Sequence, residues 1–323
     1  MKVLVLGASG FIGLPTALAF SRAGHIVYGT TRDAKSARKL EIHEIIPVIT
    51  PPTPGHGAAH WSKIAQDCDV IVDTIRTSDG DAPEGTLHAA EALSSSSPGT
   101  RKTYIYIGTL ADLQAKGAGI EGWVSETTAP TGQEAWRAQL ENQVLSSNAV
   151  NGIVIRAGIL YGRSGSTLEP YLFAPAYDAS KNGGAFDTVG FPETRVLMVH
   201  QDDLAELVVR AAERAPALKG VALAAANPQS ERWTDVLDAV IRVSGASEYR
   251  LRAPGEISAE AAWASTTQLR PTLAHALTGW TPRKLGLVDG MDAYWAAFKA
   301  HYVGKKMIPA WDLPGVVPPR ASP

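Results

Sequence analysis

Residues 2–13 read KVLVLGASGFIG, an apolar run followed by glycines at positions 7, 10 and 13. The apolar run predicts a buried strand, and the residues after Gly13 predict a helix. Glycines at this spacing let the backbone turn tightly, approach a pyrophosphate and pack the helix on the strand. The free amide groups at the helix start then favour bound phosphates. The residues expected to bind a dinucleotide here are Gly7, Ser9, Gly10, Phe11, Ile12 and Gly13.

The end of the second expected strand, residues 26–30, indicates which dinucleotide to expect. NAD binders usually carry an acid about twenty residues after the glycines, where it holds the ribose 2′-hydroxyl. This chain has Thr31 and Arg32 there, with Lys35 nearby, and a guanidinium suits a 2′-phosphate better. Asp33 could still take the place of the acid. The sequence therefore favours NADP(H), with NAD(H) as the less favoured cofactor.

Strands and helices alternate along the first two thirds of the chain. Further strands are expected at residues 45–49, 70–73, 103–107, 152–156 and 221–225. Their runs of Val and Ile are typical of strands covered on both faces. Helices are expected at residues 14–23, 58–66, 82–94, 133–146, 201–213 and 233–244. This alternation predicts an α/β fold, a Rossmann doubly wound parallel sheet.

The composition changes in the second half of the chain. Residues 161–193, and those from Asn227 onward, are richer in Gly, Pro and aromatic side chains. We therefore expect an NADP(H)-binding Rossmann domain made of residues 1–162 and 198–226. A smaller, discontinuous substrate-facing lobe would then comprise residues 163–197 and 227–323.

Charge and hydropathy exclude several classes of partner. The net charge is −2, and the sequence has no run of Lys and Arg, which argues against nucleic acid and anionic membranes. No stretch approaches the roughly 18–20 apolar residues that a membrane span needs. The expected partner is a small-molecule substrate, with a homodimer possible.

The cysteine and histidine residues indicate a protein of a reducing compartment, and they predict no metal site. Cys68 is the only cysteine and cannot form an internal disulfide; we expect it to be a packed residue rather than a nucleophile. The first strand starts at residue 2, with no secretory segment before it. The expected location is therefore the cytoplasm. His56 and His60 have no Cys or carboxylate cluster around them, so no metal site is predicted.

Four further segments match one family pattern in the right order: DVIVDTI at 69–75, IVIRAGILYG at 153–162, VHQDDLA at 199–205 and GWTP at 279–282. With residues 7–13, they resemble the extended or atypical short-chain dehydrogenase/reductase superfamily, which includes the NAD-dependent epimerases and dehydratases. The resemblance implies a Rossmann fold over nearly the whole chain. It also implies that Asp203 caps or orients rather than catalyses. The additional cofactor contacts that it implies are Thr74, Ile75, Gly108, Arg137, Ala157 and Ile159.

The chain departs from this family at the residues that do its chemistry. The family uses a Tyr acid/base and a Lys four residues later on one helix face. Glu141 stands where the family often has Glu, and counting back from it places Gln133 at the Tyr and Arg137 at the Lys. Gln cannot act as a general acid. Arg137 could hydrogen-bond the nicotinamide ribose, although a surface pair with Glu141 is the plainer interpretation.

Other hydroxyls are therefore candidates for the chemistry. Thr109 ends a strand where the family places its carbonyl-orienting Ser or Thr, although a register one residue later would put Leu110 there. Tyr161 and Tyr177, and with less weight Tyr171, could reach the pocket. Two Tyr-x-x-x-Lys matches, at 177–181 and 302–306, follow the IRAGILYG strand, whereas the family motif precedes it. The predicted catalytic residues are Thr109, Tyr161 and Tyr177.

These observations predict an NADP(H)-dependent oxidoreductase that reduces a carbonyl or an activated C=C of a small, largely apolar metabolite. The run 167–177 is apolar and lacks arginine, which disfavours a nucleotide-sugar diphosphate; it could also be core or a dimer face. Two alternatives stay open. One is a non-redox cyclase or isomerase, and the other is a cofactor-binding sensor or scaffold without catalysis.

Overall fold

The fold is built on one parallel sheet. The computed structural model describes residues 1–50, 58–75, 81–96, 101–113, 123–128, 135–163, 165–166, 168–255, 260 and 264–302. Within them, seven strands pair in the order β11-β6-β5-β4-β1-β2-β3, all parallel. They are β1 (Lys2–Leu6), β2 (Ile26–Thr31), β3 (Ile46–Ile49), β4 (Val70–Asp73), β5 (Thr103–Thr109), β6 (Asn151–Ala157) and β11 (Val221–Ala225). The predicted doubly wound parallel sheet is confirmed.

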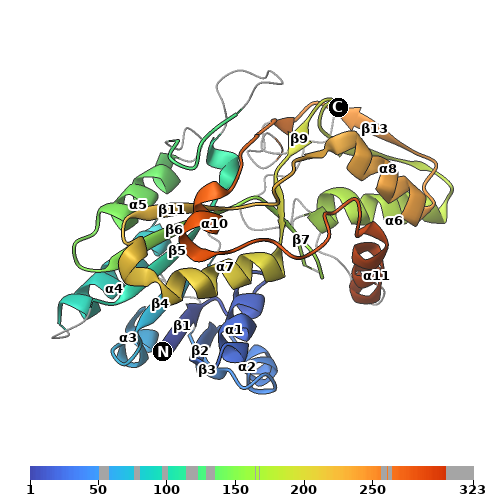
Figure 1. Ribbon diagram of the computed structural model, residues 1–323. Coiled ribbons are helices and arrows are strands. Elements are labelled where there is room, and N and C mark those ends of the chain that lie inside the picture. The colour runs from blue at the N-terminus through green and yellow to red at the C-terminus, as the bar shows by residue number, and fades with distance from the viewer. Residues whose placement is uncertain are drawn as a thin grey trace.

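Helices cover both faces of this sheet (Figure 1). One face carries α1 (Gly13–Arg22), α2 (Ala34–Glu41), α7 (Gln201–Glu213) and α10 (Thr272–Thr278). The other carries α3 (Ala58–Ala65), α4 (Asp81–Ser95) and α5 (Ala135–Ser146). Successive side chains of a strand point to opposite faces, so in β1 Val3 and Val5 pack under the first layer and Leu4 and Leu6 under the second. This explains why the strand is apolar throughout.

The strand order reverses between β1 and β4. Strands β2 and β3 follow on one side of β1, whereas β4, β5, β6 and β11 follow on the other. In open α/β sheets, ligands bind beyond the carboxyl ends of the strands at such a reversal. Gly7 after β1 and Thr74 after β4 therefore border the expected binding crevice.

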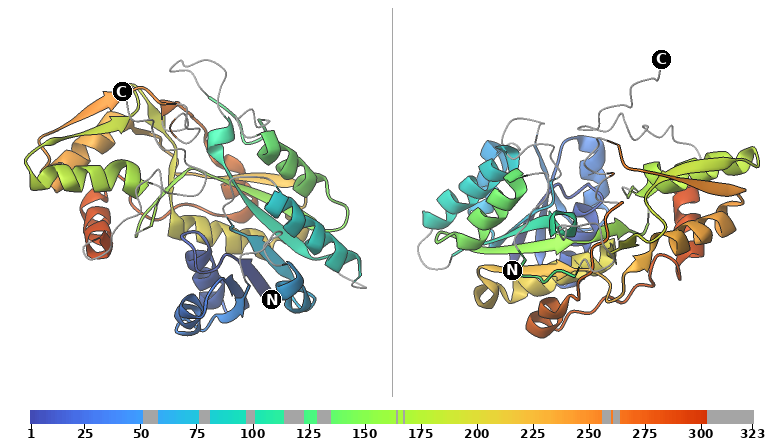
Figure 2. Two further views of the ribbon diagram at one scale, coloured as in Figure 1. Left: turned by 180° about the vertical axis from the view of Figure 1, so that it is seen from behind. Right: turned by 90° about the horizontal axis from the view of Figure 1, so that it is seen from above.

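A second lobe lies at one end of the sheet, away from α3–α5 (Figures 1 and 2). Its strand pairs are β8 (Ala185–Val189) with β13 (Glu248–Arg252) and β9 (Arg195–Val196) with β12 (Glu231–Arg232). Its helices are η3 (Glu169–Phe173), α6 (Ala174–Lys181), α8 (Trp233–Ser244) and α11 (Met291–Tyr302). Phe173, Trp233, Trp295 and Phe298 fill its own apolar core. The short pair of β7 (Ile159–Tyr161) with β10 (Met198–His200) joins the two parts; the predicted domain boundaries stay a prediction.

The remaining short helical turns are η2 (Leu110–Leu113) and η4 (Ala215–Leu218). The predicted bounds of β1, β4, α7, β11 and α8 match the structure, and those of the other predicted elements differ by one or two residues. As predicted, Cys68 is packed: its thiol donates to the Ile64 carbonyl oxygen at 3.4 Å, and burial raises its pKa to about 11. Among the described residues, no helix combines the length and apolar character needed to span a bilayer.

Candidate functional site

The turn after β1, residues 7–13, has the geometry of a phosphate-binding loop, and we call it the glycine loop. Gly7 has φ +78°, which only glycine adopts readily. Its carbonyl oxygen accepts from the Gly10 amide at 2.9 Å. A Cβ atom on Gly13 would overlap that same carbonyl. Both positions therefore require glycine, as the motif predicts.

Three amides of this loop point to a ligand. The backbone N–H groups of Phe11, Ile12 and Gly13 make no hydrogen bond within the described part of the chain. They lie at the N-terminal end of the ten-residue helix α1, whose dipole places partial positive charge there. Unpaired amides at a helix start suit a phosphate group. The loop therefore fits the pyrophosphate of a dinucleotide.

The end of β2 separates residues that hold the loop from residues that face solvent. Thr31 is buried, and its hydroxyl donates to Ser9 Oγ at 3.0 Å. Arg32 and Lys35 are exposed, and their side chains make no hydrogen bond or ion pair with the described residues. Two cationic side chains thus face solvent beyond β2, while Thr31 holds the glycine loop through Ser9.

Asp33, the alternative acid for a ribose hydroxyl, is occupied in capping α2. One carboxylate oxygen accepts from the Ser36 amide at 2.8 Å and the other from the Ser36 hydroxyl at 3.0 Å. These hydrogen bonds lower the pKa of Asp33. An N-cap of this kind stabilises the start of a helix, so the carboxylate already has a structural role.

Strand β4 ends in a buried hydrogen-bond network that the sequence analysis did not anticipate. Asp73 is buried and accepts from the hydroxyls of Thr86 at 2.7 Å and Tyr104 at 2.9 Å, and from the Ile75 amide at 3.0 Å. A Cβ atom built on Gly7 would lie 3.2 Å from Ile75 Cγ1. The network therefore holds Thr74 and Ile75 beside the first glycine of the loop. The sequence feature that could have indicated this network is the carboxylate of Asp73 at the end of an apolar strand.

The carboxyl ends of β5 and β6 meet α5 around a buried ion pair. Glu141 Oε2 accepts from Arg156 Nε at 2.9 Å, and both side chains are almost fully buried. The Arg156 guanidinium also donates to the carbonyl oxygens of Glu126 and Thr128. The expected surface location of Glu141 is wrong: its side chain points inward under Gly108, where any Cβ atom would overlap its other oxygen. Arg137 still lowers the pKa of Glu141, although burial outweighs both arginines and raises it.

Arg137 lies one helical turn before Glu141 and has other partners. Its guanidinium stacks on the Trp136 ring, 4.4 Å from the ring centroid. It also hydrogen-bonds the Tyr106 hydroxyl, which lowers the pKa of that group, but burial outweighs this and raises the pKa. Arg137 thus stands at the sheet end that carries β5, consistent with its expected place near the cofactor. Gln133, the counterpart of the family tyrosine, lies outside the described residues.

Thr109 borders a small cavity of about 30 Å³ at the end of β5. Its hydroxyl oxygen accepts from the Ala111 amide at 3.1 Å, which leaves the hydroxyl proton free to donate. Thr109 pairs with Ala157 of β6. The other cavity-lining residues are Leu110, Ala111, Gly158, Ile159, Val196, Leu197, Ser265 and Thr267. The structure therefore brings Thr109, Ala157 and Ile159 together, with hydroxyl and apolar groups around the cavity.

The tyrosine candidates have structural partners. Tyr161 is fully buried; its hydroxyl donates to the Leu285 carbonyl oxygen at 2.8 Å and accepts from Asn227 Nδ2 at 3.0 Å. Burial raises its pKa well above the usual range. Tyr161 is thus held in place from both sides of its hydroxyl, and its catalytic role stays a prediction.

Tyr177 belongs to the second lobe. Its ring packs against Trp295, Phe298 and Tyr302, and Lys181 Nζ lies 4.3 Å from its centroid. This Tyr and Lys therefore form a cation–π contact rather than a catalytic pair. Tyr171 packs against the same core. Lys306, from the second match, lies outside the described residues. The role of Tyr177 in catalysis also stays a prediction.

The apolar run 167–177 contributes mainly to the second-lobe core. Leu168, Leu172 and Phe173 are buried there, whereas the cavity beside Thr109 draws on other segments. The sequence left core packing and a dimer face open for this run, and the structure supports core packing. Thr167 itself is not among the described residues.

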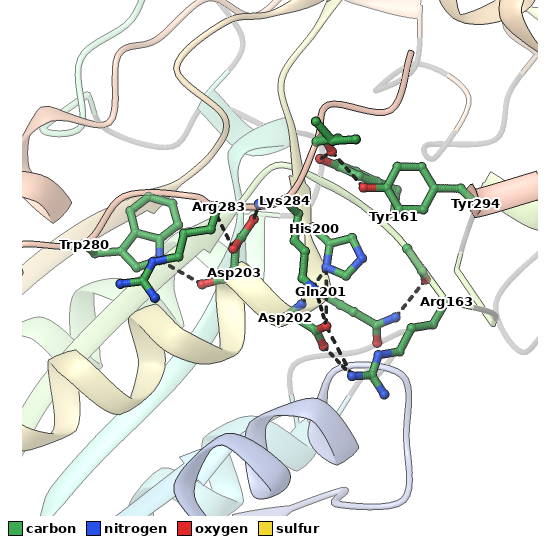
Figure 3. Close-up of polar contacts among 12 residues, drawn as sticks. Tyr161, Arg163, His200, Gln201, Asp202, Asp203, Trp280, Arg283, Lys284 and Tyr294 are labelled. Atoms are coloured by element: carbon green, nitrogen blue, oxygen red, sulfur yellow. Dashed lines mark hydrogen bonds and ion pairs between the residues drawn. The ribbon is translucent and has the colours of Figure 1, made fainter. Parts of the chain in front are cut away.

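Asp203 orients the segment after α10 (Figure 3). Its carboxylate accepts from the amides of Arg283 and Lys284, both at 3.0 Å. The cap of α7 is instead His200, whose Nδ1 accepts from the Asp202 amide at 3.0 Å. Burial lowers the pKa of His200 to about 4, so this imidazole is neutral at pH 7. The expected orienting role of Asp203 is confirmed.

The described residues contain no group of three His, Cys, Asp or Glu side chains that could hold a metal ion. His60 is exposed, and His56 lies outside the described residues.

No protein-family model matches the sequence, and no curated protein matches it. Solved structures do match the fold. A dTDP-glucose 4,6-dehydratase from Bacillus anthracis in complex with NAD aligns with TM-score 0.74 and 14% identity over 93% of this chain and 97% of that one. A UDP-glucuronic acid 4-epimerase from Bacillus cereus, in complex with UDP-glucuronic acid and NAD, aligns with TM-score 0.70 and 19% identity, covering 94% and 100%.

A third match is the human epimerase family protein SDR39U1 with NADPH, at TM-score 0.63 and 17% identity over 92% of this chain and 99% of that one. The alignments cover nearly the whole of each chain, including the second lobe. Identities this low establish the architecture alone. The chain has the fold of the NAD-dependent epimerases and dehydratases, the extended short-chain dehydrogenases that its sequence motifs resemble.

Proposed function

We propose that this protein is an NADP(H)-dependent oxidoreductase that reduces a carbonyl or an activated C=C of a small, largely apolar metabolite. The observation that carries the proposal is the set of unpaired amides of Phe11, Ile12 and Gly13 at the start of α1. Backbone donors in this position suit a pyrophosphate. The fold is one in which solved structures hold NAD or NADPH.

The choice of NADP(H) rests on the residues after β2. Arg32 and Lys35 are exposed cations without hydrogen-bond partners in the described chain. Asp33, the carboxylate next to Arg32 in the chain, is engaged by Ser36. A guanidinium and an ammonium attract a 2′-phosphate, whereas a ribose 2′-hydroxyl needs a free acceptor such as a carboxylate.

The cavity beside Thr109, at about 30 Å³, has room for a water molecule or a substrate oxygen rather than a whole metabolite, and it bears on the polarity of the group bound there. Its lining residues carry no charge, and a charged group placed there would lose hydration without a partner. The Thr109 hydroxyl is held by the Ala111 amide and can donate its proton to a substrate oxygen. Bound NADPH would supply the hydride. Arg137, at the same end of the sheet, would hold the nicotinamide ribose, and the proton would come from water or a ribose hydroxyl.

Calorimetry with NADPH and NADH tests the cofactor assignment. Wild-type protein should bind NADPH more tightly than NADH. The substitution R32Q should weaken NADPH binding about tenfold to a hundredfold, because a charge-assisted hydrogen bond contributes about 1.5–3 kcal/mol, and should leave NADH binding unchanged. R22Q, at the opposite end of α1, is the matched control. Failure of wild-type protein to bind either nucleotide would refute the proposal.

Turnover separates the three candidate functions. NADPH oxidation with a panel of aromatic and aliphatic carbonyls and enones, followed by absorbance and product analysis, should show one hydride transferred per product. A product formed with no change in the oxidation state of the cofactor would instead identify a cyclase or isomerase. Tight nucleotide binding without any product would identify a sensor or scaffold.

A further inference from the structure

Gly162, Arg163 and Gly165 follow β7 and lie next to the glycine loop, and we call them the arginine loop. Gly162 and Gly165 have φ +98° and +91°. The Gly162 carbonyl oxygen accepts from Gln201 Nε2 at 2.7 Å, and the Gly165 amide donates to Glu169 Oε1 at 2.6 Å. Both of these partners are buried. The loop is therefore fixed at both ends by side chains that cannot easily move.

This loop contacts the proposed nucleotide site. A Cβ atom built on Gly165 would lie 3.7 Å from Cδ2 of Phe11, one of the three residues with an unpaired amide. Figure 3 shows Arg163 on the side of the pale blue N-terminal ribbon, below His200 and Asp202. The second lobe thus approaches the glycine loop at this point.

Arg163 has a conformation that arginine seldom adopts. Its φ of +51° lies in the left-handed region, which costs a non-glycine residue about 1–2 kcal/mol. Strained residues of this kind cluster at ligand-binding sites, where the surrounding structure holds them. Here Gln201 and Glu169 hold the loop, as described above. If this turn had only a structural role, glycine would adopt the same φ at a lower energy than arginine.

The charges around Arg163 leave its guanidinium available. Its side chain is 48% exposed and contacts Asp202 Oδ1 at 3.0 Å. Lys284 Nζ lies 3.4 Å from Asp202 Oδ2, so Asp202 keeps a cation if Arg163 moves away. His200, on the other side of Asp202, is neutral at pH 7. Lys284 lies between Asp202 and Asp203, so Asp202 stays paired with a cation when the Arg163 guanidinium turns toward the glycine loop.

We propose that Arg163 binds the pyrophosphate of the dinucleotide from the second-lobe side, opposite the amides of the glycine loop. This inference rests on the proposed nucleotide-binding function and extends it to a residue outside the motif. A guanidinium donates two parallel hydrogen bonds to phosphate oxygens. Arg163 would exchange Asp202 for a diphosphate, which carries more charge and accepts more hydrogen bonds, while Lys284 neutralises Asp202.

The test compares two arginine variants against two nucleotides by calorimetry. The pyrophosphate is common to NADPH and NADH, whereas the 2′-phosphate belongs to NADPH alone. R163Q should therefore weaken both nucleotides by a similar factor, about tenfold to a hundredfold. R32Q should weaken NADPH only. Raising the salt concentration should weaken wild-type binding more than R163Q binding, because one phosphate contact is lost in the variant.

Two further variants distinguish a loss of nucleotide binding from a loss of folding. R163G removes the guanidinium and also relieves the left-handed strain, so it should lose affinity like R163Q while its Tm stays equal or rises. R242Q breaks the exposed second-lobe pair with Asp292 and should leave the affinity for both nucleotides unchanged.

The outcomes distinguish this inference from the proposed function. Equal affinities of wild-type protein and R163Q, with NADPH still bound, would overturn the role of Arg163 and leave the function intact. A loss confined to NADPH would assign Arg163 to the 2′-phosphate and overturn the pyrophosphate contact. Absence of nucleotide binding in wild-type protein would overturn both.

Discussion

The carboxyl edge of the sheet has two halves that differ in their chemistry. The half at β1, β2 and β4 presents backbone amides and exposed cations: Phe11 to Gly13, Arg32 and Lys35. The half at β5 and β6, together with the adjoining β7–β10 pair, contains buried titratable side chains: Tyr106, Glu141, Arg156, Tyr161 and His200. We call these the nucleotide half and the buried half.

The nucleotide half has the groups suited to binding a nucleotide, and the buried half has the titratable groups suited to acid/base chemistry. The nucleotide half keeps each feature that a dinucleotide needs, since its contacts are mostly backbone groups that the glycine spacing sets. The buried half has Glu141 and Arg156 at positions that match the pattern that the sequence resembles, but it has Arg137 where that pattern has lysine. Protons and charges there depend on burial and partners, which vary without changing the fold. Under the proposed function, a protein of this fold can therefore keep a nucleotide site while its acid/base groups differ.

The largest effect is expected in the buried half, from R156M. Removing this guanidinium leaves the Glu141 carboxylate buried without its partner, which should lower the free energy of unfolding by about 3–5 kcal/mol. Urea denaturation measures the change. The double variant E141Q/R156M, which removes both charges, should recover much of the loss, and R242M, at an exposed pair, should change stability by less than about 1 kcal/mol. A similar loss in R242M would contradict a special role for the buried pair.

Acid should destabilise the buried half through His200. Its pKa is about 6.5 in the unfolded chain and about 4 in the fold, where burial disfavours the charged form. The unfolded state therefore binds the proton first, so stability is complete above pH 6.5 and falls by about 3 kcal/mol as the pH drops to 4. Urea midpoints across this range test it. In H200N, where Asn can still cap α7, the slope should flatten; an unchanged slope would assign the acid sensitivity elsewhere.

In the nucleotide half, G13A should abolish binding. The added Cβ would overlap the Gly7 carbonyl oxygen, so the glycine loop must shift, at a cost of about 1–3 kcal/mol in stability. Calorimetry with NADPH should show no binding to protein that still unfolds cooperatively. G184A, where the added Cβ meets nothing closer than 3.8 Å, is the control and should bind normally. Normal binding by G13A would show that the loop geometry does not matter.

The smallest effect is expected at the carboxyl end of β5, in the buried half, from T109V. Loss of the hydroxyl proton removes one hydrogen bond to the substrate oxygen, so kcat/KM should fall about tenfold, corresponding to about 1.4 kcal/mol. Nucleotide affinity should not change. T109S, which keeps the hydroxyl, should restore turnover. Equal activity of T109V and wild-type protein would place the carbonyl-orienting group at another residue.

The nucleotide half could be predicted almost completely from the sequence. Glycine spacing, apolar strands and helix starts are local patterns, and the parallel sheet, the glycine loop and the exposed Arg32 follow from them. Asp33 illustrates the limit: its type allowed a ligand role, and only the contact with Ser36 shows that it caps α2. The dinucleotide fit therefore depends on residues within one βαβ unit, which are close in the chain.

The buried half could not be predicted in the same way, because its contacts join distant segments. Glu141 could pair along its helix with Arg137 or across to Arg156, and packing against Gly108 decides for Arg156. Tyr161 and Tyr177 are hydroxyls of the right kind, but their surroundings come from residues more than sixty positions away, such as Asn227 and Trp295. The sequence by itself determined the sheet and the phosphate-binding turn, since local spacing sets backbone conformation. Only the tertiary structure decided which titratable groups are buried and paired, since burial is a property of the whole packed chain.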